Sequence, residues 1–194
     1  MTSAIVLGNG RSRLEIDLDV CKAKAKIYGC NAIYREFVPD VLIATDNPIA
    51  TAIQETGYAT SNCFYTRDPI AKKGACPIPS KWKGWSSGPI AAALACADGH
   101  QQIFLVGFDL GGLEGKFNNI YADTEFYKKS QDKETYSGNW VHQFIKLSRE
   151  YPTKSFIRIM GKTTSSIHQL ETLDNFNHRS IEWFKDLLNN NGEL

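Results

Sequence analysis

Four polar clusters in this sequence follow short apolar runs, and their side chains could bind one polar ligand together. The clusters are Gly8-Asn9-Gly10, Asn31, Asp46-Asn47 and Gly107-Phe108-Asp109. Runs of this kind are typical of strands buried on both faces of a parallel sheet. Ligands of open parallel sheets bind beyond the carboxyl ends of the strands, near the point where the strand order reverses. We therefore expect the four clusters to converge on one site.

The Gly8-Asn9-Gly10 turn could hold a phosphate, because glycines let a backbone approach it closely. A helix that starts at Ser12 would add free amides and the positive end of its dipole. An NAD-type site is disfavoured, since Arg13 stands where the dinucleotide fingerprint has its third glycine. Asn31 replaces the carboxylate that would bind the adenosine ribose. A tight turn without a ligand is the alternative.

Two asparagines and a serine pair complete the candidate binding groups. Asn31 and Asn47 each carry an amide that both donates and accepts, which suits a base or a ribose. Ser86-Ser87-Gly88 could present hydroxyls and amides to a phosphate at another helix start. The alternatives are a turn for Asn31, a helix cap for Asn47 and an N-cap for Ser87.

The sequence favours no metal site and offers one candidate base. The four histidines lack metal-ligand spacing, and Asp109 is the only strand-end acid beside a glycine turn. His142 lies near the start of an expected helix and could act as a general base, or it could be an ordinary histidine on the helix surface. No GxSxG elbow, glycine-lysine phosphate loop or HExxH helix is present.

The elements that must position these residues alternate between strand and helix, which predicts an α/β fold with a parallel sheet in one domain over residues 1–194. Residues 67–85 are expected to form a mobile surface loop, and residues 110–138 a lid. A capping box of Ser12 and Glu15 predicts a helix start. Expected strands cover residues 4–7, 26–30, 41–45, 63–66, 103–106 and, as the last one, 156–160. Further helices are expected after the cap Asn47, from the cap Ser87 through 89–96, and over 140–149 and 181–188.

The amino-acid composition limits the classes of binding partner that we expect. With 22 Lys and Arg against 21 Asp and Glu, the formal net charge is +1, so duplex nucleic acid is not an expected partner. We expect no signal peptide and no membrane span, and hence a cytoplasmic protein. The five cysteines are an odd number without close pairs, which predicts free and mostly buried thiols.

The motifs together resemble the bacterial lipooligosaccharide sialyltransferases that use CMP-sialic acid. The resemblance spans about the first 125 residues, and related openings occur in hydroxymethylpterin-pyrophosphokinase-like and flagellin-modification proteins. The matching segments, in order, are Ile5 to Ser12 with Glu15-Ile16-Asp17, Cys30-Asn31, Asn47-Pro48, Ser86-Ser87-Gly88 and Ile103 to Asp109.

The resemblance implies a Rossmann-like sheet with a lid, a metal-independent reaction and no prosthetic group. It implies that Asn9, Asn31, Asn47, Ser87 and Gly88 line a site for cytidine monophosphate (CMP), and that Tyr121 matches one of two phosphate-binding tyrosines. The family's other tyrosine is replaced by Gly111, its proline by Arg11, and no histidine falls at its base position near residues 133–136.

Three hypotheses follow. The first is a glycosyltransferase that uses a nucleotide sugar and an unknown acceptor, with Tyr121 and the Ser87 helix start stabilising the departing phosphate and His142 as base. The second is a Mg²⁺-dependent pyrophosphoryl transferase that would use Asp46 and Asp109. The third is a nucleotide-binding protein without catalysis.

Overall fold

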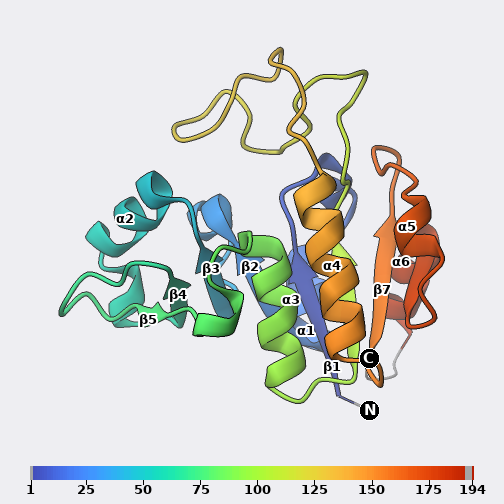
Figure 1. The fold of residues 1–194 in the computed structure, drawn as a ribbon, viewed down its shortest axis with the longest axis horizontal. Helices are drawn as coiled ribbons and strands as arrows, with labels where there is room; N and C mark the ends of the chain where they lie inside the picture. Colours follow the sequence, from blue (N-terminus) through green and yellow to red (C-terminus); the bar gives the residue numbers. More distant parts are fainter. Residues whose placement is uncertain (1, 191–193) are drawn as a thin grey trace.

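One parallel sheet organises the protein, seen in a computed structural model that describes residues 2–190 and 194 (Figure 1). Its strand order is β5-β4-β3-β2-β1-β6-β7-β8, and every neighbouring pair is parallel. The predicted Rossmann-like α/β class is therefore confirmed. The strands are β1 Ser3–Leu7, β2 Lys26–Cys30, β3 Val41–Ala44, β4 Phe64–Thr66, β5 Cys76–Pro77, β6 Gln102–Val106, β7 Ser155–Met160 and β8 Phe176–Ser180.

Helices cover both faces of the sheet, as Figure 1 shows. Two apolar clusters lie on opposite faces: α3, α4 and α5 contribute to one, and α1, α2 and α6 to the other. The helices are α1 Leu18–Lys24, α2 Asn47–Glu55, α3 Ser87–Ala97, α4 Gly138–Glu150, α5 His168–Glu171 and α6 Ile181–Asn189. Short 3₁₀ helices occupy Arg11–Glu15, Asn31–Arg35, Tyr58–Thr60 and Ser80–Trp82.

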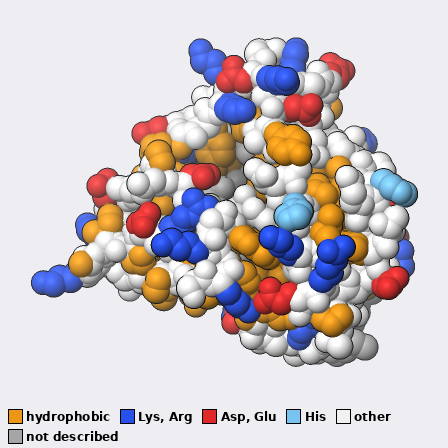
Figure 2. Space-filling model, in the orientation of Figure 1, with side chains coloured by type: hydrophobic (Ala, Val, Ile, Leu, Met, Phe, Trp, Pro, Cys, Tyr) orange, Lys and Arg blue, Asp and Glu red, His pale blue; other side chains and the backbone are white. Residues whose placement is uncertain are grey.

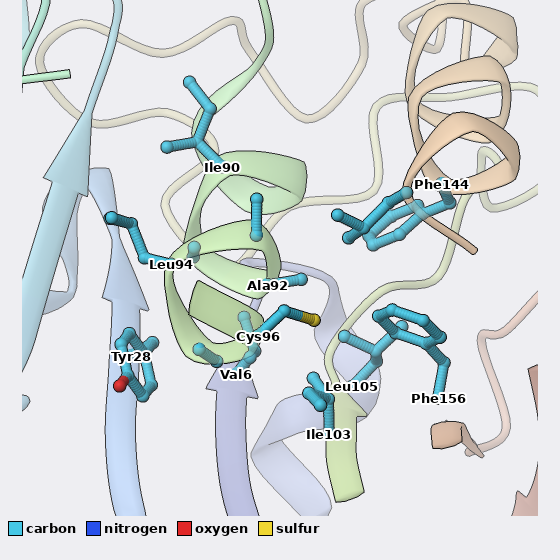
Figure 3. Packing of buried hydrophobic residues seen from close by; sticks show 14 of the residues in the cluster. Val6, Tyr28, Ile90, Ala92, Leu94, Cys96, Ile103, Leu105, Phe144 and Phe156 are labelled. Carbon is cyan, nitrogen blue, oxygen red and sulfur yellow. The ribbon is translucent and has the colours of Figure 1, made fainter. Parts of the chain in front are cut away.

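The central strands are buried on both faces because their side chains alternate between the two clusters. Val6 belongs to the cluster with α3, and its neighbour Ile5 belongs to the opposite cluster. Figure 3 shows Val6 beside Ala92 and Cys96 of α3. These small helix residues are fully or almost fully buried, and they let α3 lie close against the sheet.

The strand order reverses at β1, which positions the candidate site. The chain runs from β1 outward to β5, then crosses to β6 on the other side of β1 and continues to β8. The turns that follow β1 and β6 therefore adjoin at the carboxyl edge. Such a switch point is where open α/β sheets bind ligands.

Several local predictions were wrong. Ser12 and Glu15 form no capping box, because the Ser12 hydroxyl donates to Asp109 and a Glu15 carboxylate oxygen accepts from the Lys162 amide at 3.1 Å. The helix start here is a 3₁₀ turn. Residues 67–85 are not simply a surface loop, since they contain β5 and the Trp82 side chain is 1% exposed.

Further corrections concern caps and strands. Asp46 rather than Asn47 is the N-cap of α2, and Ser86 rather than Ser87 is the N-cap of α3. Strand β7 is not the last, because β8 pairs with it along the sheet edge. Helix α1 was not predicted; its N-cap Asp17 accepts from the backbone amides of residues 19 and 20.

The predicted lid segment, residues 110–138, projects above the carboxyl edge of the sheet in Figure 1. Its middle is fixed to the β1 turn, because the Ile120 amide donates to the Asn9 carbonyl at 2.8 Å. Two of its arms pair through the Phe117 amide and the Asp132 carbonyl, also at 2.8 Å. Movement of this segment as a lid stays a prediction.

All five cysteines, Cys21, Cys30, Cys63, Cys76 and Cys96, are free thiols. Burial raises the pKa of Cys30 to about 12. Across the part of the chain that the structure describes, no helix combines the length and apolar character needed to cross a membrane.

Candidate functional site

A cleft of about 340 Å³ opens at the carboxyl edge of the sheet, where the strand order reverses. Figure 2 shows a hollow on this face between the loop region at the top and the helices below it. Its lining comes from the turns after β1, β2, β3 and β6, from the starts of α3 and α4, from Arg67 and from the lid segment. Of the predicted binding residues, the cleft is lined by Gly8, Asn9, Gly10, Asn31, Ser87, Gly88 and Asp109.

The two glycines of the β1 turn are required by packing against the β6 turn. A Cβ added to Gly8 would lie 2.5 Å from the Gly107 carbonyl oxygen, and one added to Gly10 would lie 2.5 Å from Asp109 Cγ. Their amides donate to the carbonyls of Val106 and Gly107, each at 2.8 Å. These glycines therefore join two turns of the protein, and their amides are not free for a phosphate.

The backbone amides of the 3₁₀ helix after this turn also donate hydrogen bonds within the protein, so the prediction of free amides at Ser12 was wrong. The Arg11 amide donates to Asn118 Oδ1 at 3.2 Å, and the Ser12 amide donates to Asp109 Oδ2 at 3.2 Å. The Arg13 amide donates to the Gly10 carbonyl at 3.1 Å. Ser12 itself is buried and does not line the cleft.

Asp109 is a structural centre of the site. Its side chain is 3% exposed. Besides the Ser12 amide and hydroxyl, its carboxylate accepts from Asn118 at 3.0 Å, Thr163 at 2.6 Å and Thr164 at 3.3 Å. A ligand could reach these oxygens only by displacing protein donors. Among the described residues, no group of three or more His, Cys, Asp and Glu side chains could hold a metal ion.

Asn31 is held in a defined orientation by α3. Its backbone has φ 54°, in the left-handed region that asparagine tolerates better than most residues. Its Oδ1 accepts from Ser87 Oγ at 2.9 Å, and the same hydroxyl lies 3.0 Å from both the amide and the hydroxyl of Thr45. Within the described residues, Asn31 Nδ2 has no acceptor. The amide therefore keeps a donor for a ligand in the cleft.

The start of α3 makes one end of the cleft electrostatically positive. The amides of Ser87 and Gly88 have no acceptor within the described chain, and the helix dipole favours an anion there. Gly88 is required by packing, since a Cβ would lie 2.6 Å from Phe108 Cε1. Arg67 adds a positive charge to the lining and is oriented by the Trp85 carbonyl at 2.7 Å. Together these groups could bind a phosphate.

Tyr121, a catalytic candidate, lies outside the cleft in a buried network. Its hydroxyl accepts from Arg13 at 2.8 Å and donates to Glu36 at 2.7 Å. Arg13 also donates to Asn9 Oδ1 at 3.0 Å and forms an ion pair with Glu36 at 2.7 Å. Burial is the main cause that raises the pKa of Tyr121, so the phenol stays protonated at neutral pH.

Asn47 and His142 also lie outside the cleft. Asn47 is exposed in the first turn of α2, where its Oδ1 accepts from Thr51 at 3.5 Å. His142 is exposed on α4 in a separate hollow of about 370 Å³. We call this hollow the α4 groove; its lining includes Tyr136, Ser137, Val141, His142, Ile145 and Gln169.

The cleft contains groups that the sequence reasoning missed as site residues. Asp46 was predicted and lines the cleft, whereas Thr45, which directly follows β3, could have been included with it. Arg67 and Trp140 gave no local signal, because they reach the cleft from segments distant in the sequence. Ser86, Gly107 and Phe108 belong to predicted clusters and also line the cleft; the remaining missed lining residues are Cys30, Pro89, Leu110, Gly111, Asn118, Asn119 and Thr135.

Comparison with known proteins finds a similar fold but no related sequence. No protein-family model and no curated protein matches the sequence. The fold is similar to that of the sialyltransferase CstII from Campylobacter jejuni in complex with the substrate analogue CMP-3FNeuAc. The TM-score is 0.56 at 14% sequence identity, over 92% of this chain and 89% of that chain.

A structure of the sialyltransferase CST-II with a trisaccharide acceptor and CMP is also similar. Its TM-score is 0.53 at 14% identity, over 81% of this chain and 80% of that chain. A CstII complex with cytidine-5'-monophosphate gives 0.52 at 15% identity, over 92% and 88%. The resemblance expected from the sequence motifs is confirmed for the fold.

Proposed function

We propose that the cleft binds the nucleoside monophosphate part of a CMP-linked sugar, and that the protein transfers this sugar to an acceptor hydroxyl. The observation that carries the proposal is the Asn31–Ser87 hydrogen bond of 2.9 Å. It fixes the amide of Asn31 beside the start of α3, so that a donor for the nucleoside lies next to amides for the phosphate. The similar structures that bind CMP support the choice of nucleotide.

The phosphate-binding groups also suit the departing nucleotide. When the bond between the sugar and the phosphate breaks, negative charge grows on the phosphate oxygens. The Ser87 and Gly88 amides, the α3 dipole and Arg67 would stabilise that charge from fixed positions. Backbone amides and a guanidinium can bind a phosphate without a metal ion. This agrees with the metal independence that the sequence resemblance implies.

Transfer also requires a group that takes the proton from the acceptor hydroxyl. Asp46 lines the cleft, is exposed, and its carboxylate accepts no hydrogen bond from the described residues. In the proposed step, the acceptor oxygen forms a bond to the anomeric carbon, the bond from that carbon to the phosphate oxygen breaks, CMP leaves, and Asp46 receives the proton. His142 is the rival base, and it would have to act from the α4 groove.

A binding protein without catalysis is the second candidate. It is favoured by the observation that neither Tyr121 nor His142 lines the cleft. The pyrophosphoryl-transfer alternative has less support, because the Asp109 oxygens that it would use for Mg²⁺ already accept hydrogen bonds from the protein.

The proposal is tested by measuring binding of CMP, UMP, AMP and GMP by calorimetry and thermal unfolding, and then turnover of a CMP-sugar. We expect CMP to bind and stabilise the fold by about 2.7 kcal/mol at a concentration of ~100 times its Kd. An equal or absent response to all four nucleotides would contradict the assigned nucleotide. CMP binding without release of sugar or transfer would favour the non-catalytic candidate.

A further inference from the structure

The α4 groove is a second hollow that shares a wall with the cleft. Its volume is about 370 Å³. Thr135 and Trp140 line the cleft, while Tyr136, Ser137 and Val141, their neighbours in the chain, line the groove. The segment entering α4 and the first turn of that helix therefore separate the two hollows. A molecule held in the groove would lie next to one held in the cleft.

An exposed aromatic ring and an apolar wall give the groove its character. Tyr136 is 78% exposed. A Cβ added to Gly138 would lie 2.2 Å from both Cζ and Oη of that ring, so only glycine lets the ring rest over the start of α4. Val141, Ile145 and Ile167 provide apolar surface beside the ring. An aromatic ring next to apolar side chains suits the C–H face of a pyranose sugar.

Three polar side chains of the groove are available to a ligand. The Ser137 hydroxyl, the His142 imidazole and the Gln169 amide form no hydrogen bond with the rest of the described chain, although all three line the groove. Hydroxyl, imidazole and amide groups both donate and accept, as sugar hydroxyls do. The groove therefore pairs an apolar surface with hydrogen-bonding groups around it.

The lining also discriminates between ligand classes. It contains no Asp, Glu, Lys or Arg, in contrast to the cleft with Arg67, Asp46 and Asp109. Such a groove has no cation for a phosphate and no carboxylate for a basic ligand. Its chemistry fits an uncharged saccharide better than a second nucleotide.

We infer that the α4 groove binds the acceptor as an uncharged saccharide, with the Tyr136 ring stacked on a sugar face. This inference rests on the proposed function, which requires an acceptor beside the donor cleft. Gln169 and Ser137 would orient the sugar by its hydroxyls. The role of the groove is binding, and it holds whether Asp46 or His142 takes the proton.

The test is saturation-transfer NMR with lactose, cellobiose and maltose as probes, on the full chain with and without CMP. We expect at least one of these disaccharides to bind. Tyr136→Phe should keep this binding, and Tyr136→Ala should weaken it at least tenfold without changing CMP affinity. Trp183→Ala is a matched control, because Trp183 is an exposed aromatic residue on α6, outside the groove.

The outcomes separate the two proposals. Absence of disaccharide binding to the wild-type protein, or equal binding by Tyr136→Ala, would overturn the groove assignment. Failure of CMP to bind, together with Tyr136-dependent disaccharide binding, would overturn the donor assignment in the cleft and leave the saccharide groove standing.

Discussion

The Arg13 guanidinium donates to the Tyr121 hydroxyl over 2.8 Å, which ties the lid segment to the turn after β1. The same guanidinium donates to the Gly8 carbonyl at 2.9 Å and to Asn9 Oδ1 at 3.0 Å. Arg13 thus stands at the position that would need glycine in a dinucleotide fold, and there it fixes the amide of Asn9. This bond network determines how Asn9 faces the cleft.

Arg13→Lys should destabilise the fold and weaken CMP binding. Lysine keeps the charge but lacks the planar set of donors that serves four acceptors at once. We expect a loss of about 2 kcal/mol, the scale of a hydrogen bond to a charged group. The loss should stay below that of a fully buried pair, because Glu36 is half-exposed and its carboxylate can be hydrated. Urea unfolding and calorimetry measure both effects.

Arg11→Lys is the matched control for this substitution. Arg11 is exposed, and its side chain forms no hydrogen bond with the described residues. It should change stability by less than about 0.5 kcal/mol. Equal stability of the two variants would contradict the role assigned to Arg13.

Asn31→Gly should weaken CMP binding with little cost in stability. Glycine adopts the left-handed φ of 54° freely, so the substitution deletes the amide without straining the backbone. Loss of one hydrogen bond from a fixed neutral donor corresponds to about 1 kcal/mol, or roughly a fivefold rise in Kd, and more if Ser87 also loses its orientation. Calorimetric titration with CMP measures the change.

Asn47→Ala provides the comparison, because the sequence resemblance assigns Asn47 to the same nucleotide site. In the structure it lies outside the cleft on the exposed first turn of α2. We therefore expect a smaller effect on CMP affinity than that of Asn31→Gly. A larger effect would show that α2 moves toward the nucleotide on binding.

Gly10→Ala should lower the stability of the folded protein, because the added methyl group overlaps the β6 turn. The new Cβ would lie 2.5 Å from Asp109 Cγ and 2.7 Å from the Gly107 carbonyl oxygen. The Asp109 carboxylate accepts several hydrogen bonds, and the Gly107 carbonyl accepts one from the Gly10 amide itself. Neither group can move away easily, so we expect a loss of about 1–3 kcal/mol. Thermal unfolding in the absence of nucleotide measures it. A stable variant that has lost only CMP binding would show that Gly10 acts on the ligand and not on packing.

The sequence predicted the central sheet well because its strands are continuous apolar runs between turn residues. Strand β8 was missed because its residues, Phe-Asn-His-Arg-Ser, are mostly polar, and an edge strand needs no second buried face. Helix α1 was missed because only Cys21 of its residues is buried, so its apolar periodicity is weak. Edge elements are specified more by their neighbours than by their own pattern.

Within the site, the strand-end positions were predictable, and the contacts between them were not. Parallel strands bring their carboxyl ends to one edge, so Asn9, Asn31 and Asp46 could be grouped from the sequence. The donors that occupy Asp109 come from residues 12, 118, 163 and 164, which only the tertiary fold brings together. The sequence therefore predicted Asp109 as a residue that binds a ligand, whereas in the structure its carboxylate holds protein segments together.

Asp46→Asn should lower the turnover of a CMP-sugar with acceptor by about 10²-fold while leaving CMP affinity within a few-fold. The amide has the size of the carboxylate but cannot take up the acceptor proton. Rates are measured for Asp46→Asn and His142→Gln under the same conditions. If only His142→Gln lowers kcat, the proton acceptor is His142 and the assignment of Asp46 is wrong.

Mild acid should destabilise the protein through His178. This residue pairs with Arg158 across β7 and β8, and its Nε2 is buried without a partner among the described residues. Burial, followed by the charge of Arg158, holds the pKa of His178 below its usual 6.5, although Glu171 opposes this shift. The folded protein therefore binds this proton less readily than the unfolded chain does.

The sign of the pH dependence follows from that difference. The contribution of His178 is fully present above pH 6.5, its unfolded value, and is lost as the pH falls through its lower folded value. His100 acts in the same direction, since burial and Lys26 lower its pKa. Asp98 and Glu171 have pKa values below the ordinary 3.8 and 4.5, so their own stabilising effects are lost only in stronger acid.

We expect Tm to fall between pH 7.5 and 5.5, and His178→Gln to reduce that fall, because glutamine takes up no proton. An unchanged slope in His178→Gln would assign the acid sensitivity to other groups, with His100→Asn as the next variant to measure.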